Sequence, residues 1–119
     1  NLIRYGYYVP DCAKDHVPVF IEHGATAIMC ASDLIATGVM AELTRLGLKI
    51  PEDVSVVGFD DLPIASQLSP SLTTIRQERK ELGESAFLLL DGLVNGVAIS
   101  KLLLRAKFIA RESTGPAKK

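Results

Sequence analysis

The stretch LGLKIPEDVSVVGFDD, residues 46–61, contains the features that decide the fold. Its second half, Val54–Phe59, is an almost unbroken apolar run, which is typical of a parallel strand covered on both faces. Gly47 fits the left-handed position that follows a helix end. Asp60 and Asp61 come directly after the apolar run. The stretch therefore predicts a helix end, a connector and a buried strand that finishes in a polar turn.

Upstream of this stretch, apolar spacing predicts two more elements next to each other in the chain. Leu34–Leu46 has helical spacing, and Ala25–Ala31 is mostly apolar, as expected of a buried strand. Asn1–Tyr8 is rich in β-forming residues and is predicted to be a further strand. The alternation of strands and helices predicts right-handed βαβ units and a parallel sheet.

A helix is also predicted within Asp11–His23, with Gly24 as its stop. Pro18 leaves two alternatives, because proline removes a helical N–H and clashes with the preceding turn. It sits either in the first turn of a short helix that begins near Val17, or inside a longer helix that it kinks.

Downstream, Ile64–Leu68 is predicted to form one helical turn and Leu72–Ile75 a short strand. Lys80–Val94 has the pattern of an amphipathic helix, and Gly96 follows it. Leu102–Ala110 alternates between apolar and basic residues, which predicts a half-exposed strand near a sheet edge, with Leu102, Leu104, Ala106, Phe108 and Ala110 on one side. The residues from Thr114 to Lys119 are expected to be a frayed tail.

Composition excludes several classes of function. The 119 residues are 48% hydrophobic and carry a net charge of −1, so the chain has a core but no basic field for nucleic acid. No apolar stretch approaches membrane-spanning length. Two cysteines, Cys12 and Cys30, form no disulfide framework and are interpreted as free thiols of a cytoplasmic protein. Because the chain opens inside an expected strand, we expect it to be a fragment.

Signatures of enzymes and cofactor sites are absent from the sequence. It has no Gly-rich phosphate loop, nucleophile elbow or paired-His motif, so we predict neither an enzyme nor a cofactor. The group Asp11, Cys12, Asp15 and His16 matches no strong zinc spacing, and no metal site is predicted.

Two polar clusters come at the predicted carboxyl ends of strands, where ligands bind in open parallel sheets. Ser32 and Asp33 follow one strand, and Asp60 and Asp61 follow the next. A carboxylate offers two acceptor oxygens, which suit a vicinal diol of a sugar or the N–H groups of a purine. Tyr8 ends the first predicted strand, and its ring can stack on a ligand.

Each of these residues also has a structural interpretation. Asp33 or Ser32 precedes a helix and is a candidate N-cap. Asp60 and Asp61 are also common turn formers. For Tyr8, the alternative to stacking on a ligand is a place in the hydrophobic core. Asp60 with Asp61 as a phosphoacceptor pair would indicate a response-regulator-like domain, but no lysine late in the chain has the clear strand-end context that such a domain requires.

Four ordered motifs resemble those of the lactose-repressor/galactose-repressor (LacI/GalR) family of regulators. TAIMCASD at residues 26–33, followed by Ala36-Thr37-Gly38, is similar to the family's TAIxxxND and AxG segment. Residues 46–61 are similar to its GLxVPxDVSVVGFDD signature. PSLTTIRQ at residues 70–77 and LGESA at residues 82–86 are similar to PxLTTIxQ and LGxxA.

This resemblance implies an α/β fold of the periplasmic-binding-protein-like type I, with a parallel sheet flanked by helices and a ligand cleft between two lobes. All of residues 1–119 would be the C-terminal part of the effector-binding domain. Residues 1–69 and 100–111 would lie in the C-terminal lobe, and residues 70–99 would cross into the N-terminal lobe. The DNA-binding headpiece would be absent from this chain.

The resemblance also implies a binding site and partners. Asp60 matches the family's effector-binding aspartate, Ser32 stands where many members have a ligand-contacting Asn, and Asp33 matches the Asp that follows it. Tyr8 matches an aromatic residue that packs on the ligand, and Gln77 falls near the crossover. Serine at position 32 shortens the polar reach, so the ligand differs from a common sugar or water bridges the gap.

The expected partners are a small effector that is sugar-like or nucleobase-like, a second copy in a homodimer, and operator DNA contacted only through a headpiece outside this chain. No membrane partner is expected. The same cleft fold serves periplasmic sugar-binding proteins of transport systems, which is the alternative function. The segment Leu72–Ile75 has the regulator pattern, and it favours the regulator over the transport component.

Overall fold

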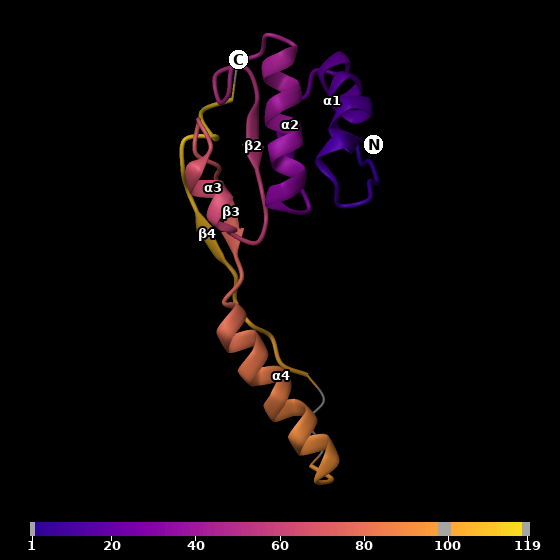
Figure 1. Ribbon diagram of the computed structural model, residues 1–119, viewed down its shortest axis with the longest axis vertical. Coiled ribbons are helices and arrows are strands. Elements are labelled where there is room, and N and C mark those ends of the chain that lie inside the picture. Colours follow the sequence, from indigo (N-terminus) through magenta and orange to yellow (C-terminus); the bar gives the residue numbers. More distant parts are fainter. Residues whose placement is uncertain (1, 98–100, 118–119) are drawn as a thin grey trace.

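The computed structural model describes residues 2–97 and 101–117 (Figure 1). Its elements follow the order η1 (Pro10–Cys12), α1 (Ala13–Glu22), β1 (Ala27–Met29), α2 (Asp33–Arg45), β2 (Ser55–Val57), α3 (Pro63–Gln67), β3 (Thr74–Arg76), α4 (Arg79–Val94) and β4 (Lys107–Ile109). The predicted alternation of strands and helices around Ala25–Phe59 is confirmed.

The strands form one parallel pair and one antiparallel pair, joined by a bridge. β1 pairs in parallel with β2, with Ile28 opposite Val56. Val57 then forms a parallel bridge with Thr73, just before β3, and β3 pairs antiparallel with β4. This order brings the carboxyl ends of β1 and β2 to the same edge of the sheet.

The core lies between the strands and the first two helices. In Figure 1, α2 lies between β2 and α1. Gly38 of α2 lets η1 pack closely, because a Cβ there would collide with the carbonyl of Pro10. The buried apolar side chains come from both layers: Val17, Ile28, Ala36, Leu43, Val56 and Leu72.

Helix α4 projects away from this body. The whole chain measures 57 × 26 × 26 Å and has a radius of gyration of 17.5 Å, whereas about 13–14 Å is expected for a compact domain of this length. The returning chain runs beside α4 (Figure 1). The predicted apolar face of α4 therefore stays largely uncovered, with Leu82 49%, Leu90 61% and Leu93 61% exposed.

The strand predicted at Asn1–Tyr8 is wrong for the residues that the structure describes. Residues 2–7 have no regular secondary structure, and Asn1 lies outside the described residues. Tyr5 and Tyr7 are 89% and 93% exposed. A tendency to form strands depends on a neighbour to pair with, and β1 pairs with β2 rather than with this segment.

Pro18 lies inside α1, which begins at Ala13 and runs through it, so the longer of the two helices is the one that forms. Gly24 has a φ of 72° and follows the helix end as predicted.

The predicted strand Leu102–Ala110 is shorter than expected, and its inward side is reversed. Ile109 is the half-buried residue, whereas Phe108 is 64% exposed. Pairing with β3 sets this parity, because it places Ile109 opposite the buried Thr74. Alternation along one strand shows which residues share a face, but only the partner strand decides which face is covered.

The expected fraying from Thr114 onward is also wrong near its start. Ser113 is fully buried, and its hydroxyl donates to the Val56 carbonyl at 2.6 Å and accepts from the Thr73 N–H at 2.8 Å. Gly115 donates its N–H to the Ser55 hydroxyl at 3.2 Å. This stretch therefore ties the chain end into the sheet.

Candidate effector-binding site

The two polar loops that follow β1 and β2 lie side by side. The Asp33 N–H donates to the Phe59 carbonyl at 2.9 Å, and the Cys30 N–H donates to the Val57 carbonyl at 2.8 Å. The clusters Ser32-Asp33 and Asp60-Asp61 therefore emerge at the same edge, as the parallel arrangement predicts.

Ser32 is the N-cap of α2. Its backbone is extended, with a φ of −155°, and its hydroxyl accepts a hydrogen bond from the Ile35 N–H at 3.2 Å. Of the two residues predicted as caps, serine takes the role, and the hydroxyl hydrogen is left for another acceptor. The side chain is mostly buried, at 7% exposure.

Asp33 is placed differently from its expectation as a ligand contact. It is completely buried, and both carboxylate oxygens are occupied. Oδ1 accepts from the Thr74 hydroxyl at 2.6 Å and Oδ2 accepts from the Leu62 N–H at 2.7 Å. The adjoining Gly58 is required by this arrangement, because a Cβ there would collide with Oδ1. Asp33 therefore holds three segments together and exposes no oxygen.

Asp60 has the opposite character. It is half-buried, and its φ of 104° lies in a region that side chains other than glycine rarely adopt. Its N–H donates to the Ile75 carbonyl at 2.8 Å, and its Oδ1 accepts from the Gln77 amide at 2.7 Å. Within the described residues nothing donates to Oδ2. One carboxylate oxygen is thus held in a fixed direction with its hydrogen-bonding capacity unused.

Gln77, the last of the predicted site residues, is brought against Asp60. The residue follows β3 and comes two positions before α4 begins at Arg79. Because its amide nitrogen is directed to Asp60, its amide oxygen is the group left to accept from a ligand.

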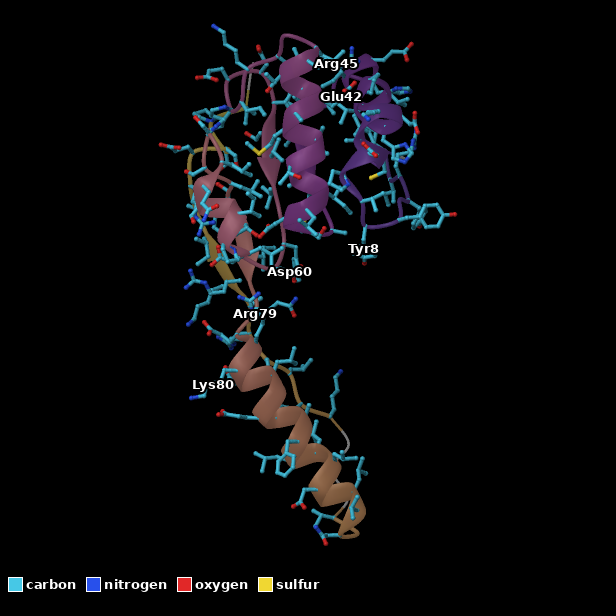
Figure 2. All side chains as sticks on the ribbon, in the orientation of Figure 1. Tyr8, Glu42, Arg45, Asp60, Arg79 and Lys80 are labelled. Atoms are coloured by element: carbon cyan, nitrogen blue, oxygen red, sulfur yellow. The ribbon has the colours of Figure 1, made fainter. Side chains whose placement is uncertain are left out.

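Tyr8 is not a core residue, which excludes one of its two interpretations. It is 67% exposed, has a φ of 50°, and borders a hollow of about 470 Å³. Figure 2 shows Tyr8 and Asp60 at the end of the body that faces α4, with Glu42 and Arg45 at the opposite end. The structure therefore places Tyr8 at the same end as the acidic loop.

Asp61 has a structural role that sequence reasoning missed. Arg111 donates to its Oδ1 and Arg76 to its Oδ2, both at 2.6 Å. Burial alone would raise the pKa of the Asp61 carboxyl, but the hydrogen bonds from the two guanidinium groups outweigh it and hold the pKa below its usual value. The sequence contains Arg76 and Arg111, but the residues beside them in the chain do not indicate that both arginines pair with Asp61.

The part of the chain that the structure describes lacks two other kinds of feature. No three His, Cys, Asp or Glu side chains in residues 2–97 and 101–117 are grouped in a way that fits a metal ion. Among the helices of these same residues, none has the length and apolar character needed to cross a bilayer.

Comparison with known proteins gives the family. Residues 6–114 match the family described as periplasmic binding protein-like domain. A curated relative, the HTH-type transcriptional repressor PurR of Salmonella paratyphi B, is 45% identical over 98 residues, which is 80% of this chain and 29% of the relative. The chain spans only 19% to 29% of the length of such relatives.

Solved structures agree. The lac repressor dimer bound to operator and the anti-inducer ONPF has a TM-score of 0.83 and 32% identity, over 92% of this chain and 39% of that one. The complex of the transcriptional regulator CelR with cellobiose has a TM-score of 0.81 and 28% identity, over 92% and 35%. The relatives are regulators rather than enzymes or transport components. This chain belongs to the periplasmic binding protein-like domain family and, within it, to the LacI/GalR transcription regulators.

Proposed function

We propose that this chain senses a small polar effector, a sugar in the first place, on behalf of a LacI/GalR-type regulator. One observation carries the proposal. Asp60 presents a single free carboxylate oxygen at the shared end of two parallel strands, and its other oxygen is fixed by Gln77 at 2.7 Å. An acceptor oxygen that is held in one direction and left unused is available to a donor on a ligand.

The free groups around Asp60 define what the effector must offer. Asp60 Oδ2 and the Gln77 amide oxygen are unused acceptors on two side chains that are hydrogen-bonded to each other, and the Ser32 hydroxyl has a hydrogen to donate. Two neighbouring donors, such as the hydroxyls of a vicinal diol, match the acceptor pair. The exposed ring of Tyr8 offers a flat apolar face to the same ligand. The cellobiose held by the CelR relative supports a carbohydrate as the first probe.

Asp33 supports the site without touching the effector. Its carboxylate joins the start of α2 to Leu62 and Thr74, so it holds the loop that carries Asp60 at a set distance from Ser32. A site of this kind depends on such buried contacts as much as on the groups that meet the ligand.

The hydrogen bond between Gln77 and Asp60 gives a route from effector binding to movement of the lobes. We propose that residues 70–99 belong to a second lobe and that the effector bridges the cleft between the lobes. Gln77 is adjacent to Glu78, which immediately precedes α4 and pairs with Lys107 at 2.6 Å. An effector that hydrogen-bonds to Asp60 therefore acts on the place where the chain leaves the body toward α4 and where it returns at Lys107. It shifts the lobes only by its differential affinity for their two arrangements.

Partners beyond the effector follow from the relatives. We propose a homodimer whose operator contacts are made by a headpiece outside these residues, in line with the lac repressor neighbour, a dimer on operator. The net charge of −1 offers no phosphate-binding surface of its own. We propose the cytoplasm as the compartment, because Cys12 and Cys30 are both free cysteines and form no disulfide framework.

The test is a titration of the ¹⁵N-labelled 119-residue chain, followed by amide NMR shifts because they report binding even at millimolar affinity. The probes are cellobiose, lactose, ribose and hypoxanthine. We expect at least one to shift the amides of Ser32, Asp60 and Gln77 together. The Asp60→Asn chain should then bind at least roughly tenfold more weakly, while Asp91→Asn on α4 binds as the unaltered chain does. Shifts confined to other residues, or equal affinity in the Asp60→Asn chain, would contradict the proposal.

A further inference from the structure

The hollow beside Tyr8 contains two thiols that the proposed function does not use. It lies between residues 2–8, α1, β1 and the start of α2, and its wall is mostly apolar. Cys12 borders it from the end of η1 and Cys30 from the end of β1, and both are free cysteines. Two cysteines that are 18 positions apart in the chain thus border one cavity.

Cys12 is the more accessible of the two. It is half-buried at the start of α1, and the backbone of Gly6 passes directly over it. A Cβ at Gly6 would lie 2.8 Å from the Cys12 sulfur, so the glycine is what makes this close approach possible. A small reagent that enters the hollow therefore reaches Cys12 first.

Cys30 is 4% exposed and faces the same hollow. Burial raises the pKa of its thiol to about 12, and the nearby Cys12 and then Asp33 add to the rise. Cys12 and Cys30 both line the hollow, and this shared wall is the geometric basis for expecting their sulfur atoms to meet. Within the described residues no hydrogen bond is made by the Cys30 sulfur.

We propose that Cys12 and Cys30 are a thiol pair that a low-molecular-weight disulfide oxidises to an intramolecular disulfide across the hollow. The inference is independent of the effector site. The bond would fix η1 to the carboxyl end of β1, two residues before Ser32.

The chemistry proceeds in two exchange steps. The Cys12 thiolate attacks one sulfur of the small disulfide, forms a mixed disulfide and releases one small thiolate. Cys30 then gives its proton to solvent, and its sulfur attacks the Cys12 sulfur and expels the second small thiolate. Two protein thiols and one small disulfide become one protein disulfide and two small thiols, so the electrons balance.

The second step is the slow one, because only the thiolate of Cys30 is nucleophilic and its pKa is about 12. At pH values below this pKa, the thiolate fraction of Cys30 rises roughly tenfold for each unit by which the pH increases. Ring closure accelerates by the same factor. The other titratable groups that face the hollow are Arg4, Tyr5, Tyr8 and His16, with Asp33 at the start of α2.

The experiment treats the folded 119-residue chain with oxidised glutathione at pH 8 and at pH 9, and follows the products by intact mass and peptide mapping. We expect one glutathione on Cys12 first, then its loss with the appearance of a Cys12–Cys30 peptide pair, faster at the higher pH. Cys30→Ala should stop at the mixed disulfide, and Cys12→Ala should not react while folded. Thermal unfolding of each variant, followed by circular dichroism, confirms that it is folded.

Two results would overturn the inference. One is a mixed disulfide on the unaltered chain that persists as long as it does on Cys30→Ala. The other is a crosslink between two chains in place of one within the chain, which would show that the Cα atoms stay farther apart than the roughly 4.4–6.8 Å that a disulfide needs. Cys12→Ser, which keeps the size of the side chain, repeats the test if Cys12→Ala is unfolded.

Discussion

The loops that follow β1 and β2 leave the same edge of the sheet, yet they use their carboxylates in opposite ways. Asp33 is completely buried with both oxygens hydrogen-bonded, whereas Asp60 is half-buried with one oxygen unused. Both belong to motifs that resemble those of a regulator, so motif membership alone does not separate a ligand contact from a structural tie. Burial together with the count of satisfied oxygens does separate them, because a satisfied buried carboxylate has nothing left to offer a ligand.

The largest effect is expected from removing the buried carboxylate. Asp33→Ala leaves the Leu62 N–H and the Thr74 hydroxyl buried without their acceptor, which should lower the free energy of unfolding by roughly 2–5 kcal/mol. Urea unfolding measures this loss. A double-mutant cycle with Thr74→Val isolates the Asp33–Thr74 bond, and additive effects of the two changes would show that the bond contributes nothing.

Removing the carboxylate of Asp60, in the second loop, should act on binding of the effector. Asp60→Asn keeps a residue that tolerates positive φ but removes the charge at the free oxygen, so the effector should bind more weakly by about 1.5–3 kcal/mol. The free energy of unfolding should change far less than in Asp33→Ala. Calorimetric titration with the sugar that binds measures the loss of affinity, and urea unfolding measures the change in the free energy of unfolding. A stability loss equal to that of Asp33→Ala would remove the distinction between the two loops.

Acid should act on the second loop through Asp61. The guanidinium groups of Arg111 and Arg76 lower its pKa in the folded state against the burial that opposes them, so its contribution is complete above the unfolded pKa of roughly 3.9. The contribution is lost as the pH falls from there through the lower folded pKa. Asp61→Asn should cost on the order of 1–3 kcal/mol at neutral pH and should flatten the dependence of stability on pH below about 4. Urea midpoints measured from pH 7 down to pH 2.5 check this, and parallel curves for the two chains would contradict it.

The smallest effect is expected on α4, outside both loops. Lys80 and Glu84 are 3.8 Å apart with side chains 89% and 64% exposed, so Lys80→Ala should change stability by less than about 0.5 kcal/mol. A loss above about 1 kcal/mol would mean that α4 makes contacts that its exposure does not suggest.

The sequence by itself determined the order of the elements from Ala25 to Phe59, the helix stops at Gly24 and Gly47, and the shared end of two parallel strands. These features are local or periodic: an apolar run, a helical stripe, a glycine at positive φ. They need no knowledge of what packs where, and this is why the position of the acidic loops was predictable.

Only the tertiary structure decided which of those residues are free. The burial of Asp33 depends on Leu62 and Thr74, which lie 29 and 41 residues further along the chain, and the Asp61 pair depends on Arg111, 50 residues away. The same holds for Asn1–Tyr8, where strand propensity found no partner, and for Phe108, whose outward side was set by the register with β3. Each outcome is a contact between distant segments, and neither periodicity nor propensity within one segment contains that information.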